Sequence, residues 1–305
     1  MKRIYDLIVI GGGPGGYTAA LYGTRAGLQV LVLEKLSAGG QMAQTSQVDN
    51  YPGFPDGIDG FELAEKMQQQ AQRFGAVTEI ANVHSVDLHG DIKEVQTSEG
   101  PFYGKAVVLA TGANPRELGV PMERELVGRG VNYCAACDGM FYRGKTVIVV
   151  GGGNSAAADA LLLSRLAKKV ILVHRRDRLR ATRVYHKPLE EAENVEFRWN
   201  SAVEAFIHDD KLTGVKLRDL QTGAVTVADA DGVFISIGRK PATELVAGQL
   251  ELDEAGYVRA GESTETNIPG VFAVGDVRTK HLRQIVTAVA DGAMAAHMAE
   301  QYLNV

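Results

Sequence analysis

One strand and its glycine turn occur twice in this chain of 305 residues, 140 positions apart. Residues 6–13 read DLIVIGGG and residues 146–153 read TVIVVGGG. The next apolar run repeats at the same distance, because residues 30–34 correspond to residues 170–174. A repeated order of strand, glycine turn, helix and strand predicts two βαβ units built on parallel sheets.

Both turns have the pattern Gly-x-Gly-x-x-Gly or its alanine variant. The first glycine permits a tight turn, the second lets a diphosphate approach the backbone, and the third lets helix and strand pack closely. These positions and their neighbours are Gly11, Gly13, Pro14 and Gly16 in the first copy, and Gly151, Gly153, Asn154, Ser155 and Ala156 in the second. We interpret both as dinucleotide sites, the alternative being turns that serve packing alone.

The two copies differ in charge 23 residues after the first glycine. The first copy has Glu34 there, whose carboxylate can accept hydrogen bonds from ribose hydroxyls. The second has His174, followed by Arg175 and Arg176 and then by Arg180. Guanidinium groups bind phosphate oxygens, so this copy favours the 2′-phosphate of NADPH unless the segment is only a solvated charged loop. The hypothesis is a flavoprotein with FAD in the first copy and NADPH in the second.

A third apolar run supports this organisation and helps to place the domain boundaries. Residues 107–112 correspond to residues 233–238, but the distance is now 126, so the first copy has 14 extra residues. The loop-like stretch 37–60 is their expected location. Pro115 and Pro241 follow the two units, and we place boundaries near residues 115 and 243. The pattern alone does not show which domain the tail after residue 243 completes.

The two cysteines lie together in the segment Cys134-Ala-Ala-Cys137-Asp138. A CxxC loop can close a readily reduced disulfide, which suits electron transfer. Zinc binding would need two further ligands that the sequence does not offer at a suitable spacing, so no metal is expected. Two inert buried thiols are the other alternative. Asp138 is placed to exchange a proton, although Asp before Gly is also common in turns.

Composition excludes several other classes of protein. With 45% hydrophobic residues the chain is not disordered, and its net charge of −5 does not favour nucleic acid or an anionic membrane as a partner. The sequence has no apolar run long enough to span a bilayer, and it begins in a strand pattern without a signal segment. We therefore expect a soluble cytoplasmic protein.

Taken in order, the motifs resemble those of low-molecular-weight thioredoxin reductase. They read GGQ, ATG, CAACDG, GGGNSA, HRRDRLRA, GDV and RQ, and the likeness extends from Tyr5 to about Leu303. The resemblance implies an α/β protein with two Rossmann-like, three-layer dinucleotide-binding domains, the NADPH domain being inserted into the FAD domain. The FAD domain would comprise residues 1–114 and 244–305, and the NADPH domain with the CxxC would comprise residues 115–243.

The resemblance also assigns roles. Cys134 would attack the disulfide of thioredoxin, Cys137 would contact the flavin and Asp138 would act as an acid. His174, Arg175, Arg176 and Arg180 would hold NADPH. The residues that would line FAD, besides the first glycine turn, are Glu34, Lys35, Gly40, Gln41, Asn50, Thr111, Gly112, Gly275, Asp276, Val277, Arg283, Gln284 and Ile285. A homodimer is implied, and hinges are expected near Pro115 and Pro241.

Two departures from the family pattern bear on these expectations. Ala158-Asp159 stands where a Glu-Glu pair is usual, which affects the region beside the nicotinamide, and Ala290 precedes Asp291 where the family has glycine. The activity expected is reduction of thioredoxin by NADPH through FAD and the Cys134–Cys137 disulfide. The alternatives are NADH or ferredoxin as the donor, a glutaredoxin-like protein as the acceptor, or a redox sensor that is not an enzyme.

Overall fold

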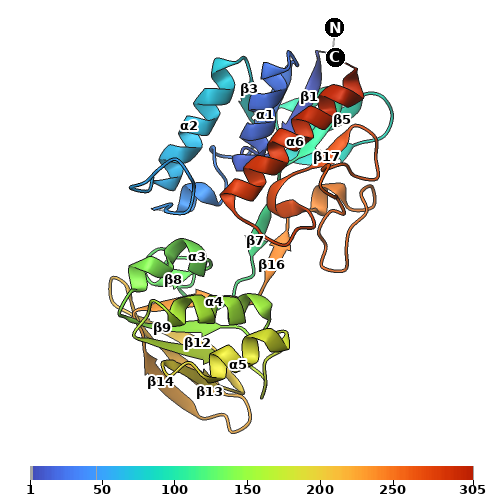
Figure 1. The fold of residues 1–305 in the computed structure, drawn as a ribbon. Coiled ribbons are helices and arrows are strands. Elements are labelled where there is room, and N and C mark those ends of the chain that lie inside the picture. Colours follow the sequence, from blue (N-terminus) through green and yellow to red (C-terminus); the bar gives the residue numbers. More distant parts are fainter. Residues whose placement is uncertain (1–2, 46, 305) are drawn as a thin grey trace. The chain divides into compact units, whose positions relative to one another are not determined.

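The computed structural model describes residues 3–45 and 47–304 and divides the chain into two units. The first unit comprises the chain up to Asn114 and again from Lys240 onward, and the second unit is Pro115–Arg239. Each unit has a sheet whose central strands are parallel, with layers on both faces (Figure 1). The expected α/β class, with one Rossmann-like unit inserted into another, is confirmed. The second crossing between units falls at residues 239 and 240, whereas the sequence placed the boundary near residue 243.

The sheet of the first unit has the strand order β3-β2-β1-β6-β5-β4, and β17 pairs with the C-terminal end of β6, beyond the part that pairs with β5. Its parallel part joins β17, β6, β1, β2 and β3, whereas β5 pairs antiparallel with both β6 and β4. The strands are β1 (Ile4–Ile10), β2 (Val30–Glu34), β3 (Val77–Ile80), β4 (Val83–Asp87), β5 (Lys93–Thr97), β6 (Gly100–Leu109) and β17 (Val271–Ala273).

Strand β1 shows why this sheet is covered on both faces. Leu7 and Val9 belong to one buried cluster, and the alternate residues Ile8 and Ile10 belong to another. Side chains alternate between the faces of a strand, so a continuous apolar run indicates two covered faces. The helices of this unit are α1 (Pro14–Arg25), α2 (Gly60–Arg73) and α6 (Ile285–Leu303), with 3₁₀ turns η1 (Met42–Gln44), η4 (Glu244–Val246) and η5 (Gly275–Val277).

Helices α1 and α6 pack closely because small residues separate them. A Cβ atom added to Gly292 would lie 2.2 Å from the carbonyl oxygen of Gly15, so no larger residue fits there without a shift of backbone. This contact holds the start of α1 against the middle of α6, and Figure 1 shows the two helices beside each other. Among the described residues, no helix combines the length and the apolar character needed to cross a bilayer.

The second unit repeats the plan with the strand order β11-β10-β9-β15-β8, all parallel. The strands are β8 (Val131–Asn132), β9 (Thr146–Val150), β10 (Lys169–Val173), β11 (Val195–Arg198) and β15 (Gly232–Ile235). One face carries the helices, which are α3 (Ala135–Asp138), η2 (Gly139–Tyr142), α4 (Asn154–Ser164), η3 (Arg183–Tyr185) and α5 (His186–Glu190). An antiparallel sheet covers the other face, made of β12 (Ser201–His208), β13 (Leu212–Asp219) and β14 (Val225–Asp229).

The two crossings between the units run beside each other. Strands β7 (Ala113–Pro115) and β16 (Arg239–Pro241) pair as a two-stranded sheet. On the side of the first unit, the Ala242 N–H donates to the Gly112 carbonyl at 2.9 Å, and the Thr111 hydroxyl donates to the Ala242 carbonyl at 2.7 Å. The crossings thus form one short ribbon.

Candidate functional site

The first glycine turn leaves an open cradle at the start of α1. Gly11 has φ +107°, and a Cβ atom there would lie 2.5 Å from the carbonyl oxygen of Ala110. A Cβ atom on Gly16 would lie 2.0 Å from the carbonyl oxygen of Gly11, whereas one on Gly13 would meet nothing within 4 Å. Gly13 also begins the helix without a side-chain cap, and Pro14 follows it. Free N–H groups beside open space fit the diphosphate of a dinucleotide.

Glu34 closes this turn from the end of β2. Its Oε2 accepts the Gly12 N–H at 2.7 Å, and its Oε1 accepts the N–H groups of Lys35 at 2.8 Å and Leu36 at 3.3 Å. The backbone therefore orients the carboxylate, whose other lone pairs can still accept ribose hydroxyls. Sequence spacing predicted Glu34 as a ligand, but it did not reveal the bond to Gly12.

Residues far apart in sequence meet at the start of α6. The side-chain amide of Asn50 donates to Oε1 of Gln284 at 3.1 Å, although 234 positions separate them. Gln284 and Thr287 form a capping box at this helix, and Ile285 is its first residue. Gln41 donates to the carbonyl of Ala113. The structure thus brings the expected loop residues Gln41 and Asn50 onto the scaffold of the first unit.

Arg283 provides a polar atom that lacks a partner. Its guanidinium lies 4.0 Å over the ring of Tyr257, and its Nε is buried without a hydrogen-bond partner among the described residues. A buried donor of this kind indicates a missing acceptor, and a bound dinucleotide can supply one. Tyr257 was not predicted, because no motif or spacing in the sequence connects it with Arg283.

The expected segment Gly275–Val277 forms the turn η5, directly after β17 and Val274. The carboxyl ends of parallel strands are where open α/β sheets bind nucleotides. Gly40, Gly112 and Gly275 all have positive φ angles, of +55°, +71° and +72°. The side chain of Lys35 is exposed beside Glu34.

The second glycine turn is built in the same way. A Cβ atom on Gly151 would lie 2.3 Å from the carbonyl oxygen of Ser236 and 2.8 Å from the Cβ of Ala156, whereas one on Gly153 would meet nothing within 4 Å. Gly153 begins α4 without a side-chain cap. Asn154 binds the chain itself, because its Oδ1 accepts the Thr182 N–H at 2.8 Å, and Ser155 is exposed. This turn also fits a diphosphate.

His174 lies beside the middle glycine of its turn, as Glu34 does in the first turn, where a Cβ atom on Gly12 would lie 2.9 Å from Oε2 of Glu34. The ring of His174 is buried, and a Cβ atom on Gly152 would lie 2.3 to 2.4 Å from the ring atoms. The ring contacts Trp199 edge-on, and its Nε2 is buried without a partner among the described residues. Burial, and then the positive charges of Arg180, Arg176 and Arg175, lower the pKa of His174. His174 therefore packs under the turn as a neutral ring.

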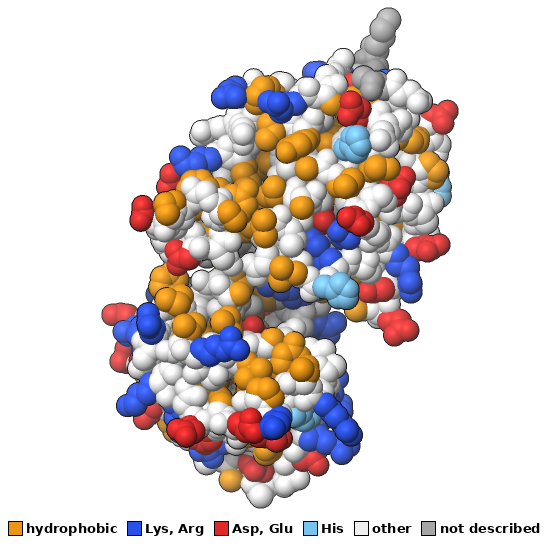
Figure 2. Space-filling model, in the orientation of Figure 1, with side chains coloured by type: hydrophobic (Ala, Val, Ile, Leu, Met, Phe, Trp, Pro, Cys, Tyr) orange, Lys and Arg blue, Asp and Glu red, His pale blue; other side chains and the backbone are white. Residues whose placement is uncertain are grey.

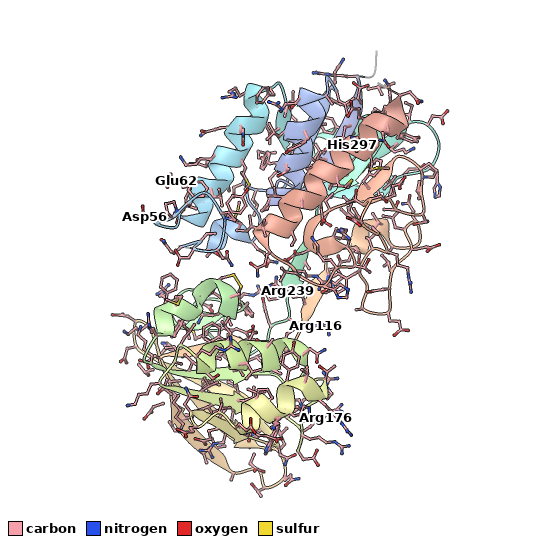
Figure 3. All side chains as sticks on the ribbon, in the orientation of Figure 1. Asp56, Glu62, Arg116, Arg176, Arg239 and His297 are labelled. Carbon is pink, nitrogen blue, oxygen red and sulfur yellow. A yellow bond between two sulfur atoms is a disulfide. The ribbon has the colours of Figure 1, made fainter. Side chains whose placement is uncertain are left out.

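The arginines after His174 point outward. Arg175, Arg176, Arg178 and Arg180 are all exposed, and Arg176 lies at the outer edge of the second unit (Figure 3). Basic side chains gather on this edge in the space-filling view (Figure 2). The Arg180 N–H donates to the Gly152 carbonyl at 2.7 Å, which fixes this segment beside the glycine turn. The cluster is therefore a cationic surface next to a dinucleotide cradle.

The CxxC segment begins at the end of β8 and forms the short helix α3. Cys134 and Cys137 form a disulfide with their Cα atoms 5.3 Å apart. Hydrogen bonds hold the segment at both ends, because the Tyr133 hydroxyl donates to Oε1 of Glu123 at 2.7 Å and the Asn132 amide donates to the Tyr142 hydroxyl at 2.9 Å. In the described part of the chain, no three His, Cys, Asp or Glu side chains gather as metal ligands.

Asp138 follows the second cysteine and is a partly buried acid. Burial raises its pKa to about 6 from the ordinary value of 3.8. No donor within residues 3–45 and 47–304 makes a hydrogen bond with this carboxylate. A carboxyl group with a pKa near neutrality and no fixed partner can give or take a proton.

The departure at Ala158-Asp159 creates a contact at the second turn. Oδ2 of Asp159 accepts the Ser236 hydroxyl at 2.5 Å, which ties α4 to the end of β15. Burial raises the pKa of Asp159, while the bond from Ser236 and the charge of Arg239 oppose that shift. The residue thus supports the strand end that Gly151 touches.

Comparisons with known proteins agree with this geometry. The family model described as pyridine nucleotide-disulphide oxidoreductase matches residues 5–292. A thioredoxin reductase of Streptomyces clavuligerus is 48% identical over 99% of this chain and 95% of its own length. One of Mycolicibacterium smegmatis is 45% identical over 99% of this chain and 97% of its own length. The crystal structure of thioredoxin reductase from Streptococcus pyogenes has a TM-score of 0.92 at 42% identity, covering 100% of this chain and 99% of that one.

Proposed function

Because the chain belongs to the pyridine nucleotide-disulphide oxidoreductase family, as one of its thioredoxin reductases, we propose that it reduces thioredoxin with electrons from NADPH, through FAD and the Cys134–Cys137 disulfide. The family implies a flavin and a nicotinamide dinucleotide. The identities of the two coenzymes and the residues that bind them are our assignments.

We assign FAD to the first unit. Its open cradle at Gly13, its acidic ligand Glu34 and the buried donor of Arg283 support a dinucleotide whose ribose lacks a 2′-phosphate. When bound, FAD accepts a hydride from the nicotinamide and passes two electrons to the disulfide. Asn50, Gln284 and the turn Gly275–Val277 would hold and orient it.

NADPH is assigned to the second unit. The cradle at Gly153 can receive the diphosphate, and the exposed arginines at 175, 176 and 180 can bind the 2′-phosphate. His174 would contribute by supporting Gly152 from beneath, since its ring is buried. The direct contact of His174 with NADPH that the sequence suggested stays a prediction.

The reduced cysteine pair would carry out the exchange with thioredoxin. The Cys134 thiolate attacks the disulfide of thioredoxin, so that a mixed disulfide forms and one thioredoxin sulfur leaves and takes a proton. The Cys137 sulfur then attacks Cys134, which restores the Cys134–Cys137 disulfide and releases the second thioredoxin thiol. Two electrons and two protons pass to thioredoxin in total. We assign the supply or uptake of the proton to Asp138, because burial raises its pKa to about 6.

The observation that carries this proposal is the disulfide in the same unit as the arginine-flanked glycine turn. The test is an anaerobic titration of the purified protein, reconstituted with FAD, first with NADPH and in a parallel sample with NADH. We expect NADPH to bleach the flavin absorption at lower concentration, and added thioredoxin to restore it over repeated turnovers. A protein that does not bind FAD, or that NADPH reduces without any transfer to thioredoxin, would contradict the proposal.

The same experiment separates the other acceptors. A glutaredoxin-like protein that reoxidises the flavin faster than thioredoxin would replace it as the substrate, and a single turnover with either would favour a redox sensor.

We further propose a homodimer in the cytoplasm that does not bind nucleic acid. The net charge of −5, a disulfide that must cycle, and the exposed apolar side chains of Tyr22 and Phe61 support this. Sedimentation equilibrium measures the oligomeric state directly.

A further inference from the structure

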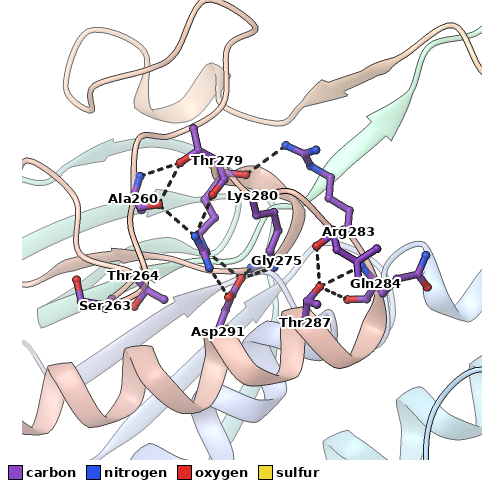
Figure 4. A network of polar contacts seen from close by, with 12 residues as sticks. Ala260, Ser263, Thr264, Gly275, Thr279, Lys280, Arg283, Gln284, Thr287 and Asp291 are labelled. Atoms are coloured by element: carbon purple, nitrogen blue, oxygen red, sulfur yellow. Dashed lines mark hydrogen bonds and ion pairs between the residues drawn. The ribbon is translucent and has the colours of Figure 1, made fainter. Parts of the chain in front are cut away.

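A buried charge cluster lies behind the turn η5. Oδ2 of Asp291, on α6, accepts the Gly275 N–H at 2.8 Å, Nε of Arg278 at 3.0 Å and Nζ of Lys280 at 2.6 Å. Oδ1 of the same carboxylate accepts Nη2 of Arg278 at 2.6 Å. Figure 4 shows these bonds converging on Asp291. One side chain of the helix thus holds both the beginning of the turn and the segment that follows it.

All three charged side chains are removed from water, with exposed fractions of 11% for Arg278 and 7% for both Lys280 and Asp291. Two cations therefore share one carboxylate. Burial lowers the pKa of Lys280, and Asp291 and, more weakly, Asp276 oppose that shift. Since a buried charge without a partner is strongly unfavourable, the position of each member depends on the others.

The cluster also reaches Arg283. Nη1 of Arg278 donates to the carbonyls of Ala260 and Thr279, and the Arg278 carbonyl accepts Nη2 of Arg283 at 3.5 Å. Arg283 is the residue whose buried Nε lacks a partner. The segment held by Asp291 therefore begins at the turn η5 and ends at Arg283, both of which the proposed function assigns to the flavin.

We propose that Asp291 is a positioning residue for the flavin, which it aligns through the turn Gly275–Val277 and Arg283, and that Lys280 adds a positive charge behind this turn. This inference rests on the proposed function. A carboxylate that only stabilised the fold would leave the electronic properties of the flavin unchanged, whereas a charge beside the flavin favours the reduced, more negative form.

The experiment compares full-length wild type with Asp291→Asn, Lys280→Met and Lys66→Met. Lys66 forms an exposed ion pair with Glu62 on α2, so its variant is a matched control for loss of a lysine partner in the same unit. Apoprotein is titrated with FAD by fluorescence quenching, and the midpoint potential of the bound flavin is measured against a reference dye. Melting curves of the apoprotein report folding separately.

We expect Asp291→Asn to weaken FAD binding at least about tenfold, because the turn is released and two cations lose their partner. Lys280→Met keeps the Arg278–Asp291 pair, so FAD should bind within about threefold of wild type. Because this variant loses one positive charge, the equilibrium between oxidised and reduced bound flavin should shift toward the oxidised form by at least about threefold. Lys66→Met should change neither quantity.

Three results would decide against the inference or its premise. A wild type that binds no FAD overturns the proposed function and this inference together. If the wild type binds FAD and Asp291→Asn binds it with the same affinity, the positioning role of Asp291 is overturned but the proposed function is not. If Asp291→Asn does not fold, Lys280→Met decides, and an unchanged flavin potential in that variant overturns the inference.

Discussion

The two glycine turns have the same backbone plan but differ in the side chain that supports them. In both turns a glycine, Gly13 in the first and Gly153 in the second, faces open space and begins a helix without a side-chain cap. Glu34 accepts the Gly12 N–H in the first turn, whereas the His174 ring fills the space beside Gly152 in the second. The first turn therefore presents a negative charge within the cradle. The second has the buried ring of His174 and exposed arginines beside it, so the two turns differ in charge at the end of their second strand.

The largest expected effect separates the two units by function. Cys134→Ser should lower thioredoxin reduction by roughly 10³-fold or more, because no thiolate remains to attack the substrate disulfide. FAD binding should be unchanged, since the first unit is intact. Steady-state assays with thioredoxin and flavin titration measure the two quantities. Full thioredoxin reduction by the variant would show that Cys134 has no catalytic role.

The next effect tests the charge of the second turn. Arg175→Ala with Arg180→Ala should raise the KM for NADPH about 10²-fold, because two charge-assisted bonds to the 2′-phosphate are lost. The KM for NADH should change little. Arg218→Ala, which removes an exposed arginine of β13 that pairs with Glu204, is the matched control. Equal losses for both coenzymes would remove the distinction between the turns.

A change in the first turn should have a smaller effect. Glu34→Gln keeps the size of the side chain but replaces a charged acceptor of the Gly12 N–H by a neutral one, so FAD binding should weaken about five- to tenfold. The exposed Glu79 of β3 offers a control in Glu79→Gln. Fluorescence titration of the apoproteins gives both constants. If Glu34→Gln binds FAD as tightly as wild type, the carboxylate does not define the first site.

The smallest effect concerns stability and Asp138, which has no counterpart in the first unit. Its pKa of about 6 lies above the ordinary 3.8, so the folded protein holds an extra proton between these values and loses stability as pH rises through them. Asp138→Asn should therefore raise the free energy of unfolding by about 1 kcal/mol at pH 7, and by less at pH 5. Urea unfolding at both pH values checks this. A gain that is equal at both would mean that the carboxyl is not buried as an acid.

The sequence predicted the parts of the fold that depend on local pattern. The repeated strands and turns are present, and the spacing of 23 residues located Glu34 correctly at the end of β2. The same spacing predicted His174 as a ligand of NADPH, which stays a prediction, and the structure adds that the His174 ring is buried beside Gly152. The antiparallel sheet β12-β13-β14 was not predicted, although β4, β5 and the first half of β6 form an antiparallel run at the corresponding place in the first copy.

Contacts between segments that are distant in the sequence were also not predicted. Asn50 meets Gln284 across 234 positions, and Asp291 meets Arg278 and Lys280 through the packing of α6 on the turn η5. The sequence placed the extra length of the first copy in the loop 37–60. Part of the difference lies in the helix, because α2 has 14 residues and its counterpart α5 has five.

The insertion of the second unit into the first has a consequence for synthesis of the chain. The second unit is one continuous stretch, Pro115–Arg239, whereas the first needs β17 and α6 from the last part of the chain to cover its sheet. A ribosome therefore releases every residue of the inserted unit before the host unit is complete, and domains fold as units once their residues are available. The second unit can therefore fold first, and the first unit completes its sheet afterwards, when β17 and α6 have been synthesised.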